Sequence, residues 1–237
     1  MRLIAFLCLI GLPGCVSTVP PQSPTRPAPQ AAANNTSAAA RVKVEQFVSV
    51  VQSVEPVAEA VCRQRTKSGT NCDFRIVVDD RPGQPVNAYQ TLDRSGRPIL
   101  AFTLSMIAEV GNRDELAFVM GHEAAHHIAG HIPRQQQNAM AGAVLLGGLA
   151  TLSGANPDAV RSAADLGASV GARSYSKEFE LEADALGTII TRSAGYDPVR
   201  GAAFFTRIPD PGDRFLGTHP PNAKRIETVR RVDAQIR

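Results

Sequence analysis

The chain has 237 residues, of which 43% are hydrophobic and 20% are charged, enough for one globular domain with a buried core. The formal net charge is only +3 and the basic residues are scattered, so the composition does not indicate a nucleic-acid partner. Tryptophan is absent and 5% of the residues are aromatic, which argues against a surface on which bases stack.

The first 14 residues have the pattern of a signal peptide. Arg2 precedes an apolar run at positions 3–12, which is too short to span a bilayer. Residues 12–15, Leu-Pro-Gly-Cys, resemble a bacterial lipobox, in which cleavage before Cys15 leaves that cysteine to be lipidated. The alternative is an ordinary secretory signal, and both place the mature protein outside the cytoplasm. Because Val16 follows the cysteine where an aspartate would signal retention, lipoprotein sorting favours the periplasmic face of the outer membrane.

Residues 16–40 are rich in proline, alanine, serine, threonine and glutamine without apolar periodicity, so we expect a disordered tether after the lipidated Cys15. The folded domain is expected to cover residues 41–237. It would begin with a helix from Val42 to about Arg65, because apolar residues recur there at helical spacing. Pro56 would kink or divide this helix.

Cys62 and Cys72 enclose a short polar loop. In an oxidising periplasm, a disulfide that closes this loop is the expected arrangement. The alternatives are two free thiols or a second metal site, but the pair lacks C-x-x-C spacing and has no histidine near it in the sequence. Three short strands are predicted after the loop, at residues 74–79, 86–92 and 98–103, and together they would form a small sheet.

Residues 122–126 have the sequence His-Glu-Ala-Ala-His. On an α-helix a step of four residues returns to nearly the same face, so His122 and His126 can bind one metal ion. Glu123 lies about 100° around the helix, where its carboxylate can take a proton from an attacking water. Two imidazole ligands and a general base on one helix are the arrangement of a zinc peptidase, and the plain alternative is a helix with surface histidines.

The flanking residues predict the helix that this motif needs. Asn112 can cap its start, and Asp114 and Glu115 fall in the first turn, where the helix dipole favours negative charge. Pro133 is expected to close the helix. Residues 135–152, glutamines followed by alanine, glycine and leucine, predict either a core helix packed through small residues or a lid or membrane-contacting segment.

A catalytic zinc site needs a third protein ligand, with the fourth position left for water. His131 follows His122 by nine residues, which places it on the opposite side of a continuous helix. We therefore interpret His131 as a structural residue or as a support for a ligand. His127 also faces away from the two ligating positions.

The acidic segment at residues 176–184 offers better candidates for the third ligand. Glu180 and Asp184 are four residues apart and share a helix face, whereas Glu178 and Glu182 share another. If Glu180 binds the metal, Asp184 behind it can accept the second ring N–H of a ligating histidine. The alternatives are Glu182 as the ligand, or an acidic face that is simply exposed to solvent.

Several motifs occur in one order that resembles a known family. They are His-Glu-Ala-Ala-His at 122–126, Glu-x-Glu-Ala-Asp at 180–184, Gly-Tyr-Asp-Pro at 195–198, Thr-His-Pro-Pro at 218–221 and Arg-Ile at 225–226. Together they resemble the HtpX/BepA-like zinc metallopeptidases, which are related to the CAAX-processing peptidases. The resemblance covers the chain from about residue 42 to its end. Lys177 and Ser105 depart from it, because arginine and glycine are usual at those positions.

The resemblance implies one Zn²⁺ per chain and a set of roles. The implied metal ligands are His122, His126 and Glu180, the implied base is Glu123, Asp184 supports a ligand, and His219 lies near the zinc. His219 would either stabilise the oxyanion or block the fourth coordination position as an inhibitory switch. Without the resemblance, its position between threonine and proline favours a structural role. In such peptidases an edge strand pairs with the substrate backbone, and residues 87–89 would be that edge or a plain structural hairpin.

The expected fold class is α+β: a mostly helical, zincin-like domain of the gluzincin type with a small three-stranded sheet beside the 122–126 helix. No helix is expected to span a membrane. In this respect the chain is similar to the periplasmic lipoprotein members of the family, which are linked to protein quality control. The expected function is a zinc endopeptidase that cleaves misfolded or misassembled outer-membrane and periplasmic proteins.

The main rival is a lipid-anchored chaperone or assembly factor with a closed or structural zinc site. The intact Glu123 argues against it, because a structural site has no use for a base at that position. A peptidoglycan-directed zinc hydrolase is a weaker alternative, because such enzymes usually use other ligand spacings.

Overall fold

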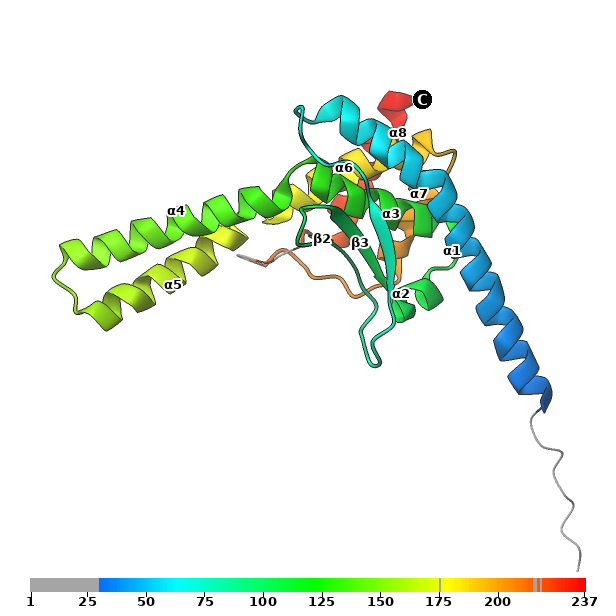
Figure 1. The fold of residues 1–237 in the computed structure, drawn as a ribbon, viewed down its shortest axis with the longest axis horizontal. Helices are drawn as coiled ribbons and strands as arrows, with labels where there is room; N and C mark the ends of the chain where they lie inside the picture. Colours follow the sequence, from blue (N-terminus) through cyan, green and yellow to red (C-terminus); the bar gives the residue numbers. More distant parts are fainter. Residues whose placement is uncertain (1–29, 175, 215–216, 218) are drawn as a thin grey trace, which may run out of the picture.

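The structure is a computed structural model, and it describes residues 30–174, 176–214, 217 and 219–237. The predicted signal peptide, Cys15 and the first part of the predicted tether lie outside the described residues. The described elements, in chain order, are α1 Gln30–Arg65, β1 Arg75–Asp79, β2 Ala88–Leu92, β3 Pro98–Thr103, α2 Leu104–Glu109, α3 Arg113–Ile128, α4 His131–Leu152, α5 Pro157–Arg173, α6 Ser176–Ser193, α7 Pro198–Gly201, the 3₁₀ helix η1 Ala202–Thr206 and α8 Asn222–Ile236. This order, helices around one small sheet, confirms the predicted α+β class (Figure 1).

Helix α1 begins earlier than the sequence predicted. It starts at Gln30, so residues 30–40 are helical and are not part of a disordered tether. Six alanines fall in this stretch, and alanine has the highest helix propensity of all residues. Pro56 lies inside α1 on its exposed side, and the helix continues through it without division. On the inner side, Val50 and Val54 are fully buried.

The three strands form one sheet with the order β1-β3-β2. The central strand β3 pairs with β1 in parallel and with β2 in antiparallel register, and β2 lies at one edge. Leu100 and Phe102 of β3 are buried, and the ring of Phe102 packs edge-on against Phe47 of α1 at 5.4 Å. A disulfide between Cys62 and Cys72 joins the end of α1 to the segment before β1.

Helix α3 is the buried centre of the domain and lies between α1, the sheet and α6 (Figure 1). Its start is capped as the sequence predicted, because Asn112 Oδ1 accepts a hydrogen bond from the Glu115 N–H at 3.0 Å. Its end was predicted wrongly. The helix stops at Ile128, and Gly130, with φ of 66°, turns the chain into α4. Pro133 therefore lies in the first turn of α4, where a missing N–H does not break a helical hydrogen bond.

Helices α3 and α6 cross at two glycines, one on each helix. A Cβ atom at Gly187 would lie 2.9 Å from the backbone N of His122, and one at Gly121 would lie 3.0 Å from the Gly187 carbonyl oxygen. The two helices can approach this closely only because glycine has a hydrogen atom in place of Cβ at both positions. The crossing brings the acidic face of α6 directly onto the helix that carries the two histidines.

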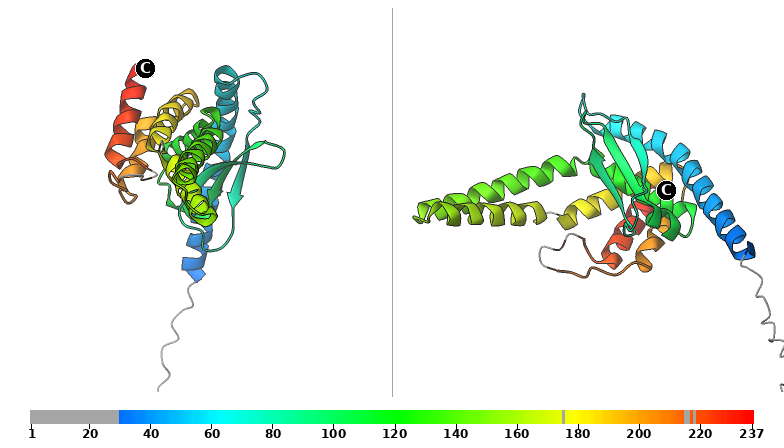
Figure 2. Two further views of the ribbon diagram at one scale, coloured as in Figure 1. Left: turned by 90° about the vertical axis from the view of Figure 1, so that its left-hand side faces the viewer. Right: turned by 60° about the horizontal axis from the view of Figure 1, so that its bottom comes forward.

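Helices α4 and α5 form an antiparallel hairpin that projects away from the rest of the domain (Figures 1 and 2). The two helices touch through backbone at Gly142 and Gly167, where an added Cβ would meet the facing carbonyl oxygen at about 2 Å. The predicted packing through small residues is therefore present, but its partner is α5, and the prediction of a core helix is wrong. Val144 and Leu152 on α4 are 75% and 87% exposed. Within the described part of the chain, no helix has both the length and the apolar composition needed to cross a membrane.

Candidate metal centre

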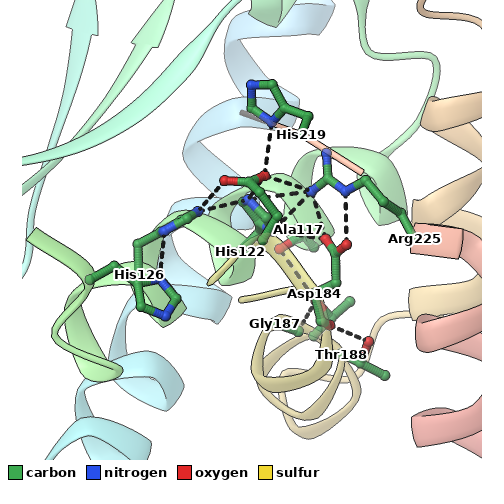
Figure 3. Close-up of polar contacts among 11 residues, drawn as sticks. Ala117, His122, His126, Asp184, Gly187, Thr188, His219 and Arg225 are labelled. Atoms are coloured by element: carbon green, nitrogen blue, oxygen red, sulfur yellow. Dashed lines mark hydrogen bonds and ion pairs between the residues drawn. The ribbon is translucent and has the colours of Figure 1, made fainter. Parts of the chain in front are cut away.

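His122 and His126 lie one turn apart on α3 (Figure 3). Glu180 approaches them from α6. The two histidine Nε2 atoms are 3.0 Å apart. Glu180 Oε2 lies 3.5 Å from His122 Nε2, and its Oε1 lies 3.4 Å from His126 Nε2. The structure therefore brings together the three side chains that the sequence singled out as ligands, from positions up to 58 residues apart.

The geometry of these three side chains fits a zinc ion. Histidine nitrogen and carboxylate oxygen bind zinc at about 2.1 Å, and a tetrahedral ion at that distance separates its ligands by about 3.4 Å. The observed separations of 3.0–3.5 Å match this value. Two imidazoles and one carboxylate also leave a fourth position free, which is the pattern of catalytic zinc sites.

Asp184 lies one turn after Glu180 on α6 and supports His122. Its Oδ1 is 2.9 Å from His122 Nδ1, the ring nitrogen that points away from the Glu180 side. Arg225 on α8 donates to both Asp184 oxygens, at 2.8 and 2.7 Å, and its guanidinium packs over the Phe205 ring at 3.9 Å. Asp184 is fully buried, and the buried Arg225 balances its charge.

The buried charges set the protonation of the metal-free site. Burial alone would lower the pKa of His122, but the carboxylates of Asp184 and Glu180 raise this pKa to about 10. Burial and the charge on His122 lower the pKa of His126 to about 3. Burial disfavours the charged form of Glu180, but its contacts with His122 and His219 outweigh burial and hold its pKa well below the usual value. A metal ion that binds here therefore competes with the proton on His122.

Glu123 is buried on α3 beside the three ligand side chains, as the helical geometry predicts. Burial raises its pKa to about 7, and the opposing influence of His122 is smaller. The backbone N–H of Gln90 on β2 has a smaller opposing influence on this pKa. A carboxylate whose pKa is near neutral can accept and return a proton at physiological pH, which is what a general base needs.

A cleft of about 600 Å³ opens in front of these groups. One wall is the edge strand β2 with the residues just before it, and the opposite wall comes from the segment between η1 and α8. Helix α4 contributes Ile132 and Gln135 from the base of the hairpin. The cleft is large enough for a stretch of extended polypeptide between β2 and the ligand side chains.

His219 lies in the segment before α8, on the cleft side of the ligand cluster. Its Nδ1 is 3.1 Å from Glu180 Oε2, and its side chain is 54% exposed. Figure 3 shows its ring on the opposite side of the cluster from Asp184. The structure thus puts His219 within reach of whatever binds in the cleft.

Three other residues considered from the sequence are not among the three ligand side chains. Glu182 has a half-exposed side chain and pairs with Arg134 at 2.7 Å, so it does not face the two ligating positions. His127 Nε2 is 2.7 Å from the Asn71 carbonyl oxygen, near the disulfide loop. His131 contacts His126 through the ring nitrogen that faces away from Glu180, and it is not a ligand.

Sequence reasoning missed the role of Arg225. Arg225 is part of the Arg-Ile motif at 225–226, but its pairing with Asp184 spans 41 residues and no local spacing reveals it. This contact exists only because α8 packs beside α6.

Comparison with known proteins gives the family. The model of peptidase family M48 matches residues 46–233. The chain is 31% identical over 119 residues to mitochondrial metalloendopeptidase OMA1 of Arabidopsis thaliana, covering 48% of this chain and 24% of that protein. It is 33% identical over 117 residues to a putative beta-barrel assembly-enhancing protease of Vibrio cholerae, covering 46% of this chain and 24% of that protein. It is 30% identical over 139 residues to the beta-barrel assembly-enhancing protease of Escherichia coli O157:H7, covering 53% of this chain and 28% of that protein. The match spans about a quarter of the length of these relatives.

The M48 match takes in every residue of the candidate centre, and on that ground the chain belongs to peptidase family M48, whose members are metal-dependent peptidases.

Proposed function

We propose that this protein is a zinc-dependent endopeptidase of the bacterial cell envelope that cleaves misfolded or misassembled outer-membrane and periplasmic proteins. The observation that carries the proposal is the convergence of His122, His126 and Glu180 beside a buried Glu123 at the floor of a polypeptide-sized cleft. A structural zinc site would use four protein ligands and would have no need for a cleft or a base.

Zinc held by His122, His126 and Glu180 would polarise the scissile carbonyl and stabilise the charge that develops on its oxygen. Glu123 accepts the proton of the attacking water and later donates it to the leaving amine. Glu123 and Gln90 of β2 both line the cleft, which puts the base beside the edge strand. Asp184 and Arg225 hold the His122 ring in place.

The edge strand β2 supports a substrate that is extended and unfolded. One side of β2 pairs with β3, and the other lines the cleft beside Glu123. A substrate strand that pairs with this edge would be held mainly by its backbone, so many sequences would be accepted. Broad acceptance of unfolded chains suits quality control, and two relatives carry names that refer to the assembly of β-barrels.

The proposed location is the periplasmic face of the outer membrane, with Cys15 as a lipid anchor. The support is the lipobox-like sequence at residues 12–15 and the disulfide between Cys62 and Cys72, which requires an oxidising compartment. Metabolic labelling with an alkyne-tagged fatty acid tests this, because Cys15→Ser should abolish the label.

The decisive experiment for the proposed activity replaces the base. Glu123→Gln should keep the zinc content of wild type and lose nearly all cleavage of casein and of an unfolded outer-membrane protein. Glu178→Gln, an equivalent change at an exposed position on α6, is the matched control and should behave as wild type. Cleavage by Glu123→Gln at the wild-type rate would refute the catalytic assignment. A zinc-loaded wild type that cleaves neither substrate, while its deletion still impairs envelope assembly, would favour the lipid-anchored chaperone.

His219 has two proposed roles that one variant separates. As an oxyanion donor its replacement should lower kcat, whereas as an inhibitory ligand its replacement should raise it. His219→Ala, assayed with the same substrates, tells these apart by the sign of the change.

A further inference from the structure

His126 makes a contact on the side of its ring that faces away from the other two ligand side chains. Its Nδ1 lies 2.8 Å from the Nδ1 of His131, while its Nε2 faces His122 and Glu180. His131 is the first residue of α4 and is 4% exposed. Which nitrogen of a buried neutral imidazole carries the hydrogen depends on the groups that its two nitrogens contact.

The second nitrogen of His131 is also paired. His131 Nε2 lies 3.2 Å from Glu182 Oε2, and that oxygen accepts a hydrogen bond from Arg134 Nη1 at 2.7 Å. The His131 ring stacks on the Phe179 ring with a centroid distance of 4.6 Å and an angle of 9°. Packing on Phe179 fixes the plane of the ring, and Glu182 fixes which of its nitrogens carries the hydrogen.

The direction of these hydrogen bonds follows from the chemistry of the carboxylate. Glu182 can only accept, so His131 Nε2 carries the hydrogen and His131 Nδ1 presents a lone pair. That lone pair accepts the hydrogen on His126 Nδ1. His126 is then the tautomer whose Nε2 lone pair is free, and Nε2 is the atom that faces the other two ligand side chains.

We propose that His131 is a positioning residue for the metal site: it holds His126 in the tautomer and ring orientation that bind zinc through Nε2, and Glu182 and Arg134 set His131 for that task. The inference rests on the proposed assignment of His126 as a ligand. In this arrangement His131 supports His126 in the way that Asp184 supports His122. Because His131 and Arg134 both lie in the first turn of α4, the base of the α4–α5 hairpin is part of the metal site.

Two substitutions of His131 separate its hydrogen bond from its packing. His131→Phe keeps an aromatic ring to stack on Phe179 but has no acceptor for His126. His131→Asn removes the ring but places an amide oxygen close to the position of the histidine Nδ1, so it can still accept. All variants are made in the full chain with Glu123→Gln, so that zinc binding is measured without any peptidase activity.

The primary measurement is the apparent zinc affinity by competition with a chromogenic chelator. We expect His131→Phe to weaken zinc binding about 10- to 100-fold, and His131→Asn to stay within about 3-fold of the parent. Glu182→Gln should weaken it about 3- to 10-fold, and Glu178→Gln on the same helix should leave it unchanged. In the zinc-loaded parent, ¹⁵N chemical shifts should show the hydrogen of the His126 ring on Nδ1.

Thermal unfolding of the metal-free variants shows whether each is folded. A folded His131→Phe variant that binds zinc within about 2-fold of the parent would overturn the proposal, as would a His131→Asn variant as weak as His131→Phe. A His126 ring with its hydrogen on Nε2 would overturn it as well. Failure of the proposed function looks different: a chain with intact Glu123 would bind zinc and cleave nothing, while the ranking of zinc affinities would still hold.

Discussion

Replacing Gly187 with alanine should separate α3 from α6 and weaken the metal site without touching any ligand. The added methyl group would lie 2.9 Å from the His122 backbone N and 3.0 Å from its Cα. Carbon atoms need about 3.5–4.0 Å, so the helices must move apart locally by roughly 0.5–1 Å. Glu180 lies about two helical turns before Gly187, so it moves together with this part of α6.

The magnitude follows from two opposing contributions. Overpacking of this kind costs about 1–3 kcal/mol, and the higher helix propensity of alanine offsets about 1 kcal/mol of that. Gly148→Ala is the matched control, because no atom lies within 4 Å of a Cβ at this position on α4. The free energies of unfolding of the two variants should therefore differ by about 1–3 kcal/mol, or about 2–12 °C in Tm.

The assay has two parts: thermal unfolding of the metal-free proteins, and chelator competition for zinc. Zinc ligands must lie within about 0.2 Å of their ideal distances, so a shift of 0.5 Å or more between His122 and Glu180 should lower zinc affinity at least about tenfold. If Gly187→Ala matches Gly148→Ala in both Tm and zinc affinity, the close crossing is not what holds the ligands together, and this reasoning fails.

Three further predictions concern the scaffold around the site. Replacing Cys62 and Cys72 together by serine should lower the free energy of unfolding by about 3 kcal/mol. Urea titration with and without reductant measures this difference, and a double variant whose stability changes with reductant would contradict the prediction. Burial opposes ionisation of Glu115, but Arg207 at its side holds its pKa below the usual 4.5, so its stabilisation is present above that pH and is lost as pH falls through the folded pKa. Glu115→Gln should therefore be less stable than wild type by about 1.5–3 kcal/mol at about pH 7, and the gap should shrink below about pH 4.5 in urea unfolding at each pH; a constant gap would refute it. Gly130→Ala should cost about 1–2 kcal/mol, because φ of 66° disfavours a Cβ, and an unchanged urea midpoint would show that the α3–α4 turn can relax.

The local features of the site could be predicted because they depend on neighbours in sequence. The four-residue step between His122 and His126, and the cap at Asn112, involve backbone hydrogen bonds and side chains within one or two helical turns. Helical periodicity alone determines which of these side chains share a face. The same argument grouped Glu180 with Asp184 on one face of α6 and Glu182 on another.

Where the helices end was harder to predict. Pro133 is the strongest helix-breaking residue in that part of the chain, yet α3 ends at Ile128, five residues before it, and Gly130 turns the chain into α4. The sequence is compatible with a helix that ends before Gly130 and with one that continues to Pro133. The stacking of His131 on Phe179 of α6 is present in the first arrangement, and it depends on the tertiary structure. That break is what allows His131 to turn back onto His126.

By itself, the sequence determined that one helix of this protein presents two imidazoles and a carboxylate with the spacing of a zinc peptidase, because that geometry repeats every turn. The tertiary structure alone decided which acidic face of α6 meets them, through the contact of Gly121 with Gly187, and which buried groups, Arg225 among them, surround the site. Spacing along a helix depends on local backbone geometry. The close crossing of α3 and α6 depends instead on two distant glycines, which have no side chain where the helices meet.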